Sequence, residues 1–486
     1  MESSLSNEDL APVPAHKRTW SLWSIAALWV GMAICIPTYT LASSLVDKGW
    51  SWTAAVLSVA LGNLVVLVPM VLNGHAGTRY GIPFPVLVRA SFGVLGSNVP
   101  ALMRAVVACG WFGIQTWIGG SAIYEIARAL HPSPVGLPQV LPAWLGVGTG
   151  PFLCFLIFWA MNVAIIVRGM ESIRVFENWS APFLLAVGVA LFAWAWHAVG
   201  DLGPILATKP DASRTGFGAI LGAGLTSAVA FWGTLALNIP DFSRYARSQR
   251  DQLIGQAIGL PPTMTMFAFI GAAVTNATAI VFGKRISDPV QLLARIGGPL
   301  TRVISMVALL VATLTTNLAA NVVSPANDLA NLSPRRISFR RGALITAVIG
   351  ILMLPWKLYN DAGQYLFTWL LGYGAMLGSV GGVMIADYFF IRRKQLKLDD
   401  LYRRGGVYEY RRGFNTVALV ALAAGIAPNV PGFLGALGVL EVAPLFATIY
   451  EWAWFVAFFL AGAVYLAGMH LLAPALVADA QRVVAP

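Results

Sequence analysis

Charged residues are scarce in this sequence. Asp, Glu, Lys and Arg make up 11% of its 486 residues, while hydrophobic residues make up 58%. A soluble domain carries about 25% charged residues, so this composition excludes a soluble enzyme and indicates a protein that crosses a membrane many times. The formal net charge of +11 falls in short segments between apolar runs. This pattern indicates membrane-topology signals and argues against a nucleic acid polymer as partner.

Motifs for covalent or metal chemistry are also lacking. The three cysteines, Cys35, Cys109 and Cys154, lie inside apolar runs, so no disulfide framework is implied. There is no phosphate-binding glycine loop, no His/Cys/carboxylate metal spacing and no Gly-x-Ser-x-Gly motif. Glu125 and the carboxylates Asp241 and Asp387 stand at the ends of apolar runs, so none is predicted to be buried as a proton relay or paired for acid–base catalysis. The sequence therefore predicts a protein that is not an enzyme.

The apolar runs themselves predict an all-α membrane protein. Each is close to the ~20 residues that a bilayer requires, and we count twelve predicted spans. They cover residues 21–42, 53–73, 99–128, 151–168, 181–198, 218–239, 260–282, 303–323, 341–355, 366–391, 414–428 and 449–473. Between the second and third spans, the half-polar loop 74–98 is expected to hold a short interfacial or re-entrant helix over 86–92.

The basic residues orient these spans. With the N-terminus inside, most of the 32 lysines and arginines fall on the inner side of the membrane. The positive-inside rule then places both termini in the cytoplasm. Residues 1–20 lack the basic-then-apolar order of a signal peptide, and we interpret them as a cytoplasmic tail, with a second tail at 474–486.

Two spans that lie five apart share an unusual pattern. Residues 29–37 and 232–240 each read Trp-Gly or Trp-x-Gly, then four or five further residues, then Ile-Pro. Spans interrupted by glycine and proline at matching positions of two halves point to the binding site of a secondary transporter. Gly31 and Gly233 are predicted to mark the breaks. Because five is an odd number, a second block of five spans would be inverted in the membrane; the alternative is two ordinary proline kinks.

Polar side chains inside the third and eighth spans supply candidate ligands. Trp111 and Gln115 are four residues apart and so share one helix face, and Gly110 and Gly113 allow a backbone or a ligand to approach closely. In the eighth span Asn317 and Asn321 are also four apart, and Thr316 stands beside Asn317. Such oxygen atoms suit a small alkali cation. The alternatives are a packed Trp with a Gln bonded to a neighbouring helix, and threonines bonded to their own helix.

These motifs resemble the nucleobase:cation symporter-1 family. The resemblance runs through Lys17–Trp20, Trp111–Trp117, Thr316–Pro325 and the segment from Asp387 to Arg403, and it covers nearly the whole chain. It implies an inverted repeat of five plus five helices, here 21–198 and 199–391. It further implies a cytoplasmic loop and two extra helices within 392–473.

The resemblance also implies site residues. A planar ring would lie between Trp111 and Trp232, its edge held by Gln115 and Asn321, with Asn317, Phe231 and Cys35 nearby. A sodium ion would be held by oxygen atoms of Gly31, Ile34, Ala312, Thr315 and Thr316. Two positions depart from the family pattern: Cys35 replaces a glutamine and Phe231 replaces a glycine. Both departures favour a small, unsubstituted ring.

Together these features predict a symporter that imports a small planar nucleobase or cyclic ureide, such as uracil, cytosine, allantoin or hydantoin, across the inner membrane of a bacterium. Sodium is the expected coupling ion, because both threonine hydroxyls are present and no buried carboxylate is predicted. Proton coupling is the alternative, and a channel or receptor on the same scaffold is the alternative of a different class. The sequence does not distinguish among the rings and does not indicate an oligomeric state.

Overall fold

The computed structural model describes residues 5–130, 137–168, 170–207, 221–359, 368–474 and 477. Within them every regular element is a helix. Eight helices are long and apolar enough to cross a membrane, or up to nine if one bent pair counts as a single span. The twelve spans of the sequence analysis therefore stay a prediction in number. Each includes helical residues of the described chain, but the spans predicted over 218–239 and 366–391 begin outside it, and most of the predicted tail 474–486 also lies outside the described residues.

The helices of the first half begin with a bent pair and include two long straight spans. In chain order they are α1 (Leu22–Ala33), α2 (Ile36–Asp47), α3 (Trp52–Tyr80), α4 (Phe84–Leu87), α5 (Arg89–Phe92), α6 (Asn98–Leu130), α7 (Thr149–Arg168), α8 (Met170–Val199) and α9 (Leu202–Leu206), with 3-10 turns η1 (Ala15–Lys17) and η2 (Ala143–Leu145). The short helices α4 and α5 occupy the loop where a re-entrant helix was predicted, and their side chains are buried.

The second half repeats this mixture of long and interrupted helices. They are α11 (Ala223–Phe231), α12 (Gly233–Asn238), α13 (Pro240–Ser243), α14 (Gln249–Phe282), α15 (Pro289–Leu293), α16 (Pro299–Asn321), α17 (Val323–Leu332), α18 (Phe339–Leu352), α19 (Pro355–Leu358), α20 (Leu371–Ile385), the π-helix η5 (Ala386–Ile391), η6 (Leu398–Tyr402), α21 (Thr416–Ile426), η7 (Ala427–Asn429), α22 (Val430–Ala436), α23 (Pro444–Glu451) and α24 (Ala453–Leu472). Several helices are longer than the predicted spans, since α14 begins at Gln249 and α17 continues α16 to Leu332.

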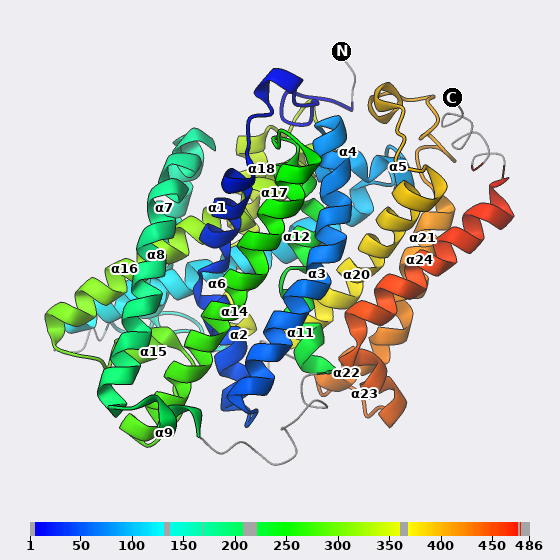
Figure 1. The fold of residues 1–486 in the computed structure, drawn as a ribbon. Coiled ribbons are helices and arrows are strands. Elements are labelled where there is room, and N and C mark those ends of the chain that lie inside the picture. Colours follow the sequence, from blue (N-terminus) through cyan, green and yellow to red (C-terminus); the bar gives the residue numbers. More distant parts are fainter. Residues whose placement is uncertain are drawn as a thin grey trace.

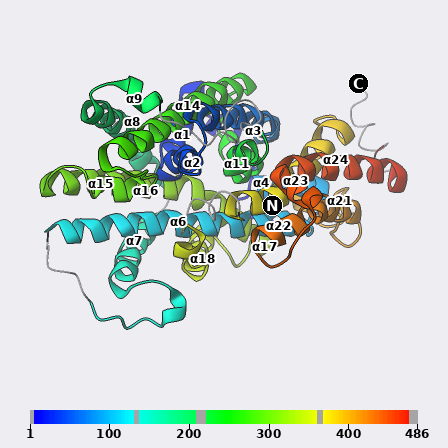
Figure 2. The same cartoon turned by 90° about the horizontal axis from the view of Figure 1, so that it is seen from below.

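The helices pack in two groups, each around one long member (Figures 1 and 2). In the α14 group, α14 contacts α1, α2 and α3, and α3 in turn contacts α11, α12 and α13. In the α6 group, α6 contacts α7, α16, α17 and α18. Figure 2 shows the two groups on opposite sides, with α20, α21 and α24 packed together at one end.

Both predicted breaks are present. α1 and α2 meet at an angle of 55°, and the backbone leaves helical geometry at Ile34 and Cys35 (φ −141°, ψ 163°). This is three residues later than the glycine that we expected to mark the break, because Pro37 occupies the first turn of α2 and so fixes where the helix restarts. The second break separates α11 from α12 at Trp232 (φ −97°, ψ 10°), directly before Gly233.

The N-terminal tail, residues 5–21, lies across the face at which α1 begins, and we name this the N-terminal face (Figure 1). The backbone of Trp20 pairs with the segment after α13: its N–H donates to the carbonyl of Tyr245 at 2.9 Å. Further along, a carboxylate oxygen of Asp9 accepts from the backbone N–H of Phe339 at 3.0 Å, at the start of α18. The tail thus contacts both helix groups.

Candidate functional site

One cavity lies where the two breaks meet the third and eighth predicted spans. The empty space between its lining atoms is about 340 Å³. The residues that line it come from α1, α2, α6, α11, α12, α16 and the two breaks, and none of them is charged. They are Met32, Cys35, Pro37, Trp111, Gln115, Phe231, Trp232, Thr234, Leu235, Thr316, Ala320 and Asn321.

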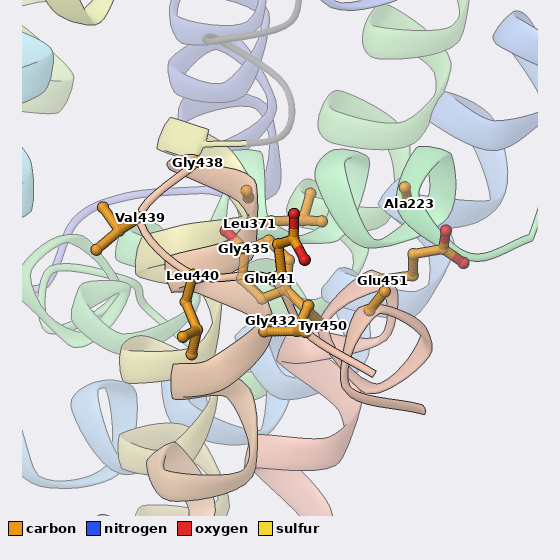
Figure 3. Close-up of a pocket in the computed structure, with 13 residues that line it drawn as sticks. Ala223, Leu371, Gly432, Gly435, Gly438, Val439, Leu440, Glu441, Tyr450 and Glu451 are labelled. Carbon is orange, nitrogen blue, oxygen red and sulfur yellow. The ribbon is translucent and has the colours of Figure 1, made fainter. Parts of the chain in front are cut away.

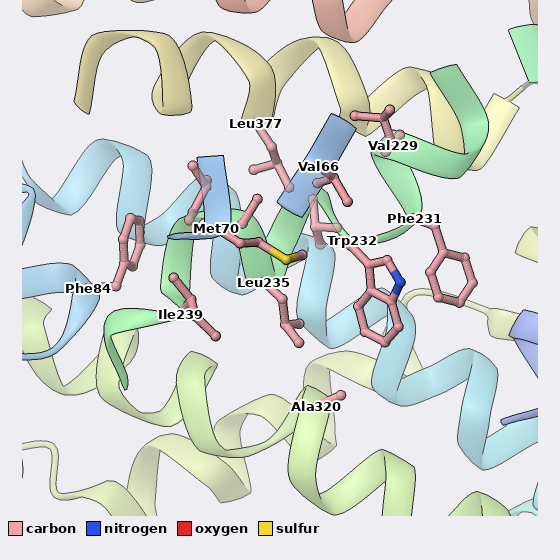
Figure 4. Packing of buried hydrophobic residues seen from close by; sticks show 14 of the residues in the cluster. Val66, Met70, Phe84, Val229, Phe231, Trp232, Leu235, Ile239, Ala320 and Leu377 are labelled. Carbon is pink, nitrogen blue, oxygen red and sulfur yellow. The ribbon is translucent and has the colours of Figure 1, made fainter. Parts of the chain in front are cut away.

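The aromatic walls of this cavity meet at Phe231. Its ring centroid lies 5.4 Å from that of Trp111 and 5.0 Å from that of Trp232, both edge to face. Figure 4 shows Trp232 between Phe231 and Leu235, with Ala320 of α16 on the facing helix. Phe231 therefore occupies the space between the two indoles, which limits the width of any ring bound there.

Each indole contacts another aromatic residue that does not line the cavity. The indole N–H of Trp111 donates to the hydroxyl of Tyr373 in α20 at 3.3 Å. Trp232 packs edge to face against Trp29 of α1, with centroids 5.2 Å apart. The sequence analysis identified neither Tyr373 nor Trp29 as a supporting residue, because aromatic residues are frequent in spans and periodicity does not say which of them meet.

The amides differ in how much of their hydrogen bonding the protein uses. Gln115 is 2% exposed, and its Oε1 has no hydrogen-bond partner among the described residues. Asn321 donates from Nδ2 to Oδ1 of Asn317 at 3.1 Å. Asn317 in turn donates to Oδ1 of Asn162 at 3.1 Å and to the hydroxyl of Thr116 at 3.2 Å. The structure thus places Asn317 behind Asn321, outside the cavity lining, while Gln115 keeps an acceptor that a ligand can use.

Oxygen atoms of α1 and α16 come together beside this cavity. The Thr316 hydroxyl lies 3.5 Å from the carbonyl oxygen of Gly31. Because the N–H of Cys35 donates to Ala33 at 3.0 Å, it does not close the usual helical bond to Gly31. The Thr315 hydroxyl lies 2.8 Å from the carbonyl of Ala312.

These atoms, with Ile34 at the break itself, are hard neutral ligands of the kind that alkali cations take. In the described chain there is no group of three or more His, Cys, Asp or Glu side chains placed to hold a metal ion. The donor set therefore fits a sodium ion better than a transition metal.

A second hollow opens at the face opposite the N-terminal face (Figure 3). It has about 1330 Å³ of empty volume between α22, α23 and the start of α11, and it carries the carboxylates Glu441 and Glu451. It lacks paired indoles and amides among its lining residues. The central cavity is therefore the better candidate for a planar ligand.

The prediction that no carboxylate is buried inside the molecule was wrong. Asp241, Asp328 and Asp387 are each 1% exposed. Asp328 escaped notice because the predicted eighth span ended at 323, whereas α17 carries the helix on to Leu332. Asp328 could have been identified as buried if the eighth span had been allowed to continue as a helix past the small polar residues at its predicted end.

Comparison with known proteins gives a consistent picture. A family model described as permease for cytosine/purines, uracil, thiamine and allantoin matches residues 12–457. A purine-uracil permease of Arabidopsis thaliana is 46% identical, with 96% of this chain and 78% of that protein covered. An allantoin permease of Bacillus subtilis (strain 168) is 40% identical, with 97% and 94% covered. The structure of MHP1, a nucleobase-cation-symport-1 family transporter in a closed conformation with bromovinylhydantoin bound, superposes with a TM-score of 0.80 at 26% identity and covers 99% of this chain and 100% of that one.

Proposed function

This chain belongs to the family of permeases for cytosine, purines, uracil, thiamine and allantoin, and from this premise we propose that it imports one small planar ring together with a sodium ion. Members of the family are transporters, not enzymes, and the fold of this chain is that of MHP1. The observation that carries the proposal is the uncharged cavity of indoles and amides at the meeting point of two broken helices.

The walls of the cavity support a neutral aromatic ring or a flat ureide as the substrate. Base-on-aromatic stacking contributes ~1–3 kcal/mol per ring, and in this proposal Trp111 and Trp232, which both line the cavity, each supply one face. The free Oε1 of Gln115 can accept from a ring N–H. Phe231 narrows the site, so uracil, cytosine, allantoin or unsubstituted hydantoin is favoured over an arylated hydantoin.

Sodium is the proposed coupling ion because the Thr316 hydroxyl and the Gly31 carbonyl bring hard oxygen atoms together beside the α1 break. The Thr315 hydroxyl bonds carbonyls of its own helix and would turn from them to join the ion. The buried carboxylates Asp241 and Asp328 give proton coupling a specific observation in its favour. It is therefore the second candidate within the same function. A channel on this scaffold is disfavoured, since conduction prefers several weak sites in file, and the candidate site in the described part of the chain is a cavity enclosed by two broken helices.

The proposed orientation has the N-terminal face in the cytoplasm of a bacterium. This face carries the basic loop 392–412, as the positive-inside rule requires for a cytoplasmic loop. Import then proceeds by alternating access: the two helix groups part first at the opposite face and then at the N-terminal face.

The experiment is uptake into proteoliposomes under imposed gradients. Labelled uracil, cytosine, allantoin, hydantoin and benzyl-hydantoin are tested with an inward sodium gradient at constant pH, and with a pH gradient at constant sodium. We expect saturable uptake of at least one unsubstituted ring that follows the sodium gradient. Uptake that follows only the pH gradient would make protons the coupling ion. If none of these rings accumulates above protein-free liposomes, the proposed substrate class is wrong.

A further inference from the structure

A second polar cluster lies between the cavity and the N-terminal face. Its charged members are Arg104 of α6, Asp241 of α13 and Asp328 of α17. Arg104 is 0% exposed and each aspartate is 1% exposed. All three are close enough to interact electrostatically, and Nη1 of Arg104 lies 3.4 Å from Oδ2 of Asp328. Charged groups buried at this depth are expensive and mark functional sites by default.

The cluster is aligned with the cavity. α6 begins at the N-terminal face, and α13 and α17 end there (Figure 1). Each charged residue lies two to three helical turns nearer to that face than a cavity residue of the same span does. Two turns of helix correspond to ~10 Å along the axis. The pairs are Arg104 with Trp111, Asp328 with Asn321, and Asp241 with Trp232.

Much of the hydrogen-bonding capacity of the cluster is unused. Nε and Nη2 of Arg104 and Oδ1 of Asp328 have no hydrogen-bond partner among the described residues. Asp241 is better satisfied: its Oδ1 accepts from the backbone N–H of Phe84 at 2.9 Å, and its carboxylate also interacts with the hydroxyl of Ser324 and with Arg244. A buried ion pair offsets the cost of its desolvation only when its geometry is good and its remaining hydrogen bonds are made. The pair here has one long contact, so its free donors and acceptors are available to a ligand.

A hydrogen bond between the two helix groups lies between the cavity and the cluster. The amide of Asn238 in α12 donates to the hydroxyl of Ser324 in α17. Both residues lie along their helices between the cavity and the charged side chains, beside buried apolar residues such as Ile239 and Val323. Since α12 belongs to the α14 group and α17 to the α6 group, parting of the two groups at the N-terminal face would break this hydrogen bond.

We propose that Arg104, Asp241 and Asp328 form a release site, which binds the transported ring between the cavity and the N-terminal face. This inference rests on the proposed function. The guanidinium of Arg104 donates to ring carbonyls and the carboxylates accept from ring N–H groups, so the site reads the –CO–NH–CO– edge that uracil, hydantoin and allantoin share. Two weak stations in sequence let a substrate enter and still leave.

The test compares transport from the two sides of the membrane. The double variant Arg104→Gln/Asp328→Asn removes one positive and one negative charge, so the net buried charge is unchanged. The matched control is Arg392→Gln/Asp387→Asn, a second buried ion pair at 2.7 Å that lies in η5 and after it, away from the cavity lining. Both are reconstituted in vesicles of known orientation, and the half-saturating uracil and allantoin concentrations are measured for influx and for efflux.

We expect the double variant to raise the half-saturating concentration on the N-terminal side about tenfold, which corresponds to ~1.4 kcal/mol. The opposite side should change by less than about twofold, as should both sides of the control. A shift of equal size on both sides, or on neither, overturns the release site. If the double variant does not fold, Asp241→Asn leaves the Arg104–Asp328 pair intact and should give the same one-sided shift. A wild-type protein that transports neither ring contradicts the proposed function instead.

Discussion

Phe231 sets the width of the central cavity. Its ring contacts those of both Trp111 and Trp232, so removing it opens space between the two indoles. We expect the wild type to reject benzyl-hydantoin, and Phe231→Gly to bind it while binding uracil less tightly. Phe231→Leu should give intermediate values. Dissociation constants from tryptophan fluorescence quenching test this. A Phe231→Gly protein that still rejects benzyl-hydantoin would show that another residue limits ring size.

Trp111 and Trp117 stand on the same helix but differ in their surroundings. Trp111 lines the cavity, whereas Trp117 packs against Trp356 with centroids 5.8 Å apart, outside the lining. Trp111→Ala should weaken ring binding by ~1–3 kcal/mol, the value of one stacked face, or about tenfold to hundredfold. Trp117→Ala is the control and should leave the dissociation constant unchanged. Isothermal titration with the transported ring distinguishes them, and equal losses would place the binding site elsewhere.

The proposed ion site can be tested against a matched control residue that lies within one turn of the same helix. The hydroxyl of Thr316 faces the carbonyl of Gly31 at 3.5 Å, while that of Thr313 bonds the carbonyl of Leu309 at 2.8 Å within its own helix. Thr316→Ala removes one hard ligand, so we expect the half-saturating sodium concentration to rise about tenfold, or ~1.4 kcal/mol. Thr313→Ala should leave it unchanged. The test is uptake measured as a function of sodium concentration at fixed pH. If Thr316→Ala does not alter the sodium dependence, the ion does not bind at the proposed position.

Which asparagine lines the cavity was not predictable at the residue scale. Asn317 and Asn321 share one helix face by spacing, and the pattern assigns both to the substrate. Only tertiary contacts separate them, since Asn162 and Thr116 already engage Asn317. The same holds for the buried charges: the sequence shows an aspartate near the end of an apolar run, but not that a helix continues and buries it.

The glycines of the elements differ in how much space they have. A Cβ on Gly113 of α6 would lie 2.5 Å from the carbonyl oxygen of Gly350 in α18, whereas a Cβ on Gly233 would lie 3.7 Å from its nearest neighbour, Tyr373. We therefore expect Gly113→Ala to destabilise the protein by ~1–3 kcal/mol through overpacking. Gly233→Ala should be tolerated. Thermal unfolding in detergent compares the two, and an equal loss of stability would contradict this difference.

At the element scale the sequence predicted the helices better than their ends. Apolar runs located the long helices, because a run of about twenty apolar residues is stable in few structures other than a membrane-spanning helix. The two breaks followed from glycine and proline. Their exact positions did not, since Pro37 restarts α2 at Ile36 whatever precedes it. The early start of α14 at Gln249 was missed because its first turns, at the N-terminal face, are polar and hydropathy does not register them.

At the scale of the whole molecule, the N-terminal tail joins parts that the chain separates widely. Asp9 accepts from the first N–H of α18, as a helix cap supplied from a distant segment. Asp9→Ala should cost ~1 kcal/mol, the typical value of a lost cap. Glu8→Ala, at the exposed neighbouring position, is the control. Thermal unfolding in detergent measures both, and an Asp9→Ala protein as stable as the wild type would show that the tail contributes little to the closed face.

The contacts of the tail also constrain how the protein is made. Asp9 bonds a residue 330 positions later, and the carbonyl of Leu10 accepts from the hydroxyl of Tyr402, which lies 392 positions later. At ~5–20 residues per second, the ribosome completes these partners on the order of tens of seconds after the tail has emerged. During that interval the tail lacks these two contacts and has only those to earlier segments, such as the bond from the N–H of Val13 to the carbonyl of Gly81. Closure of the N-terminal face is therefore one of the last steps of biosynthesis, and a nascent chain stalled before η6 exposes the surface that the tail later covers.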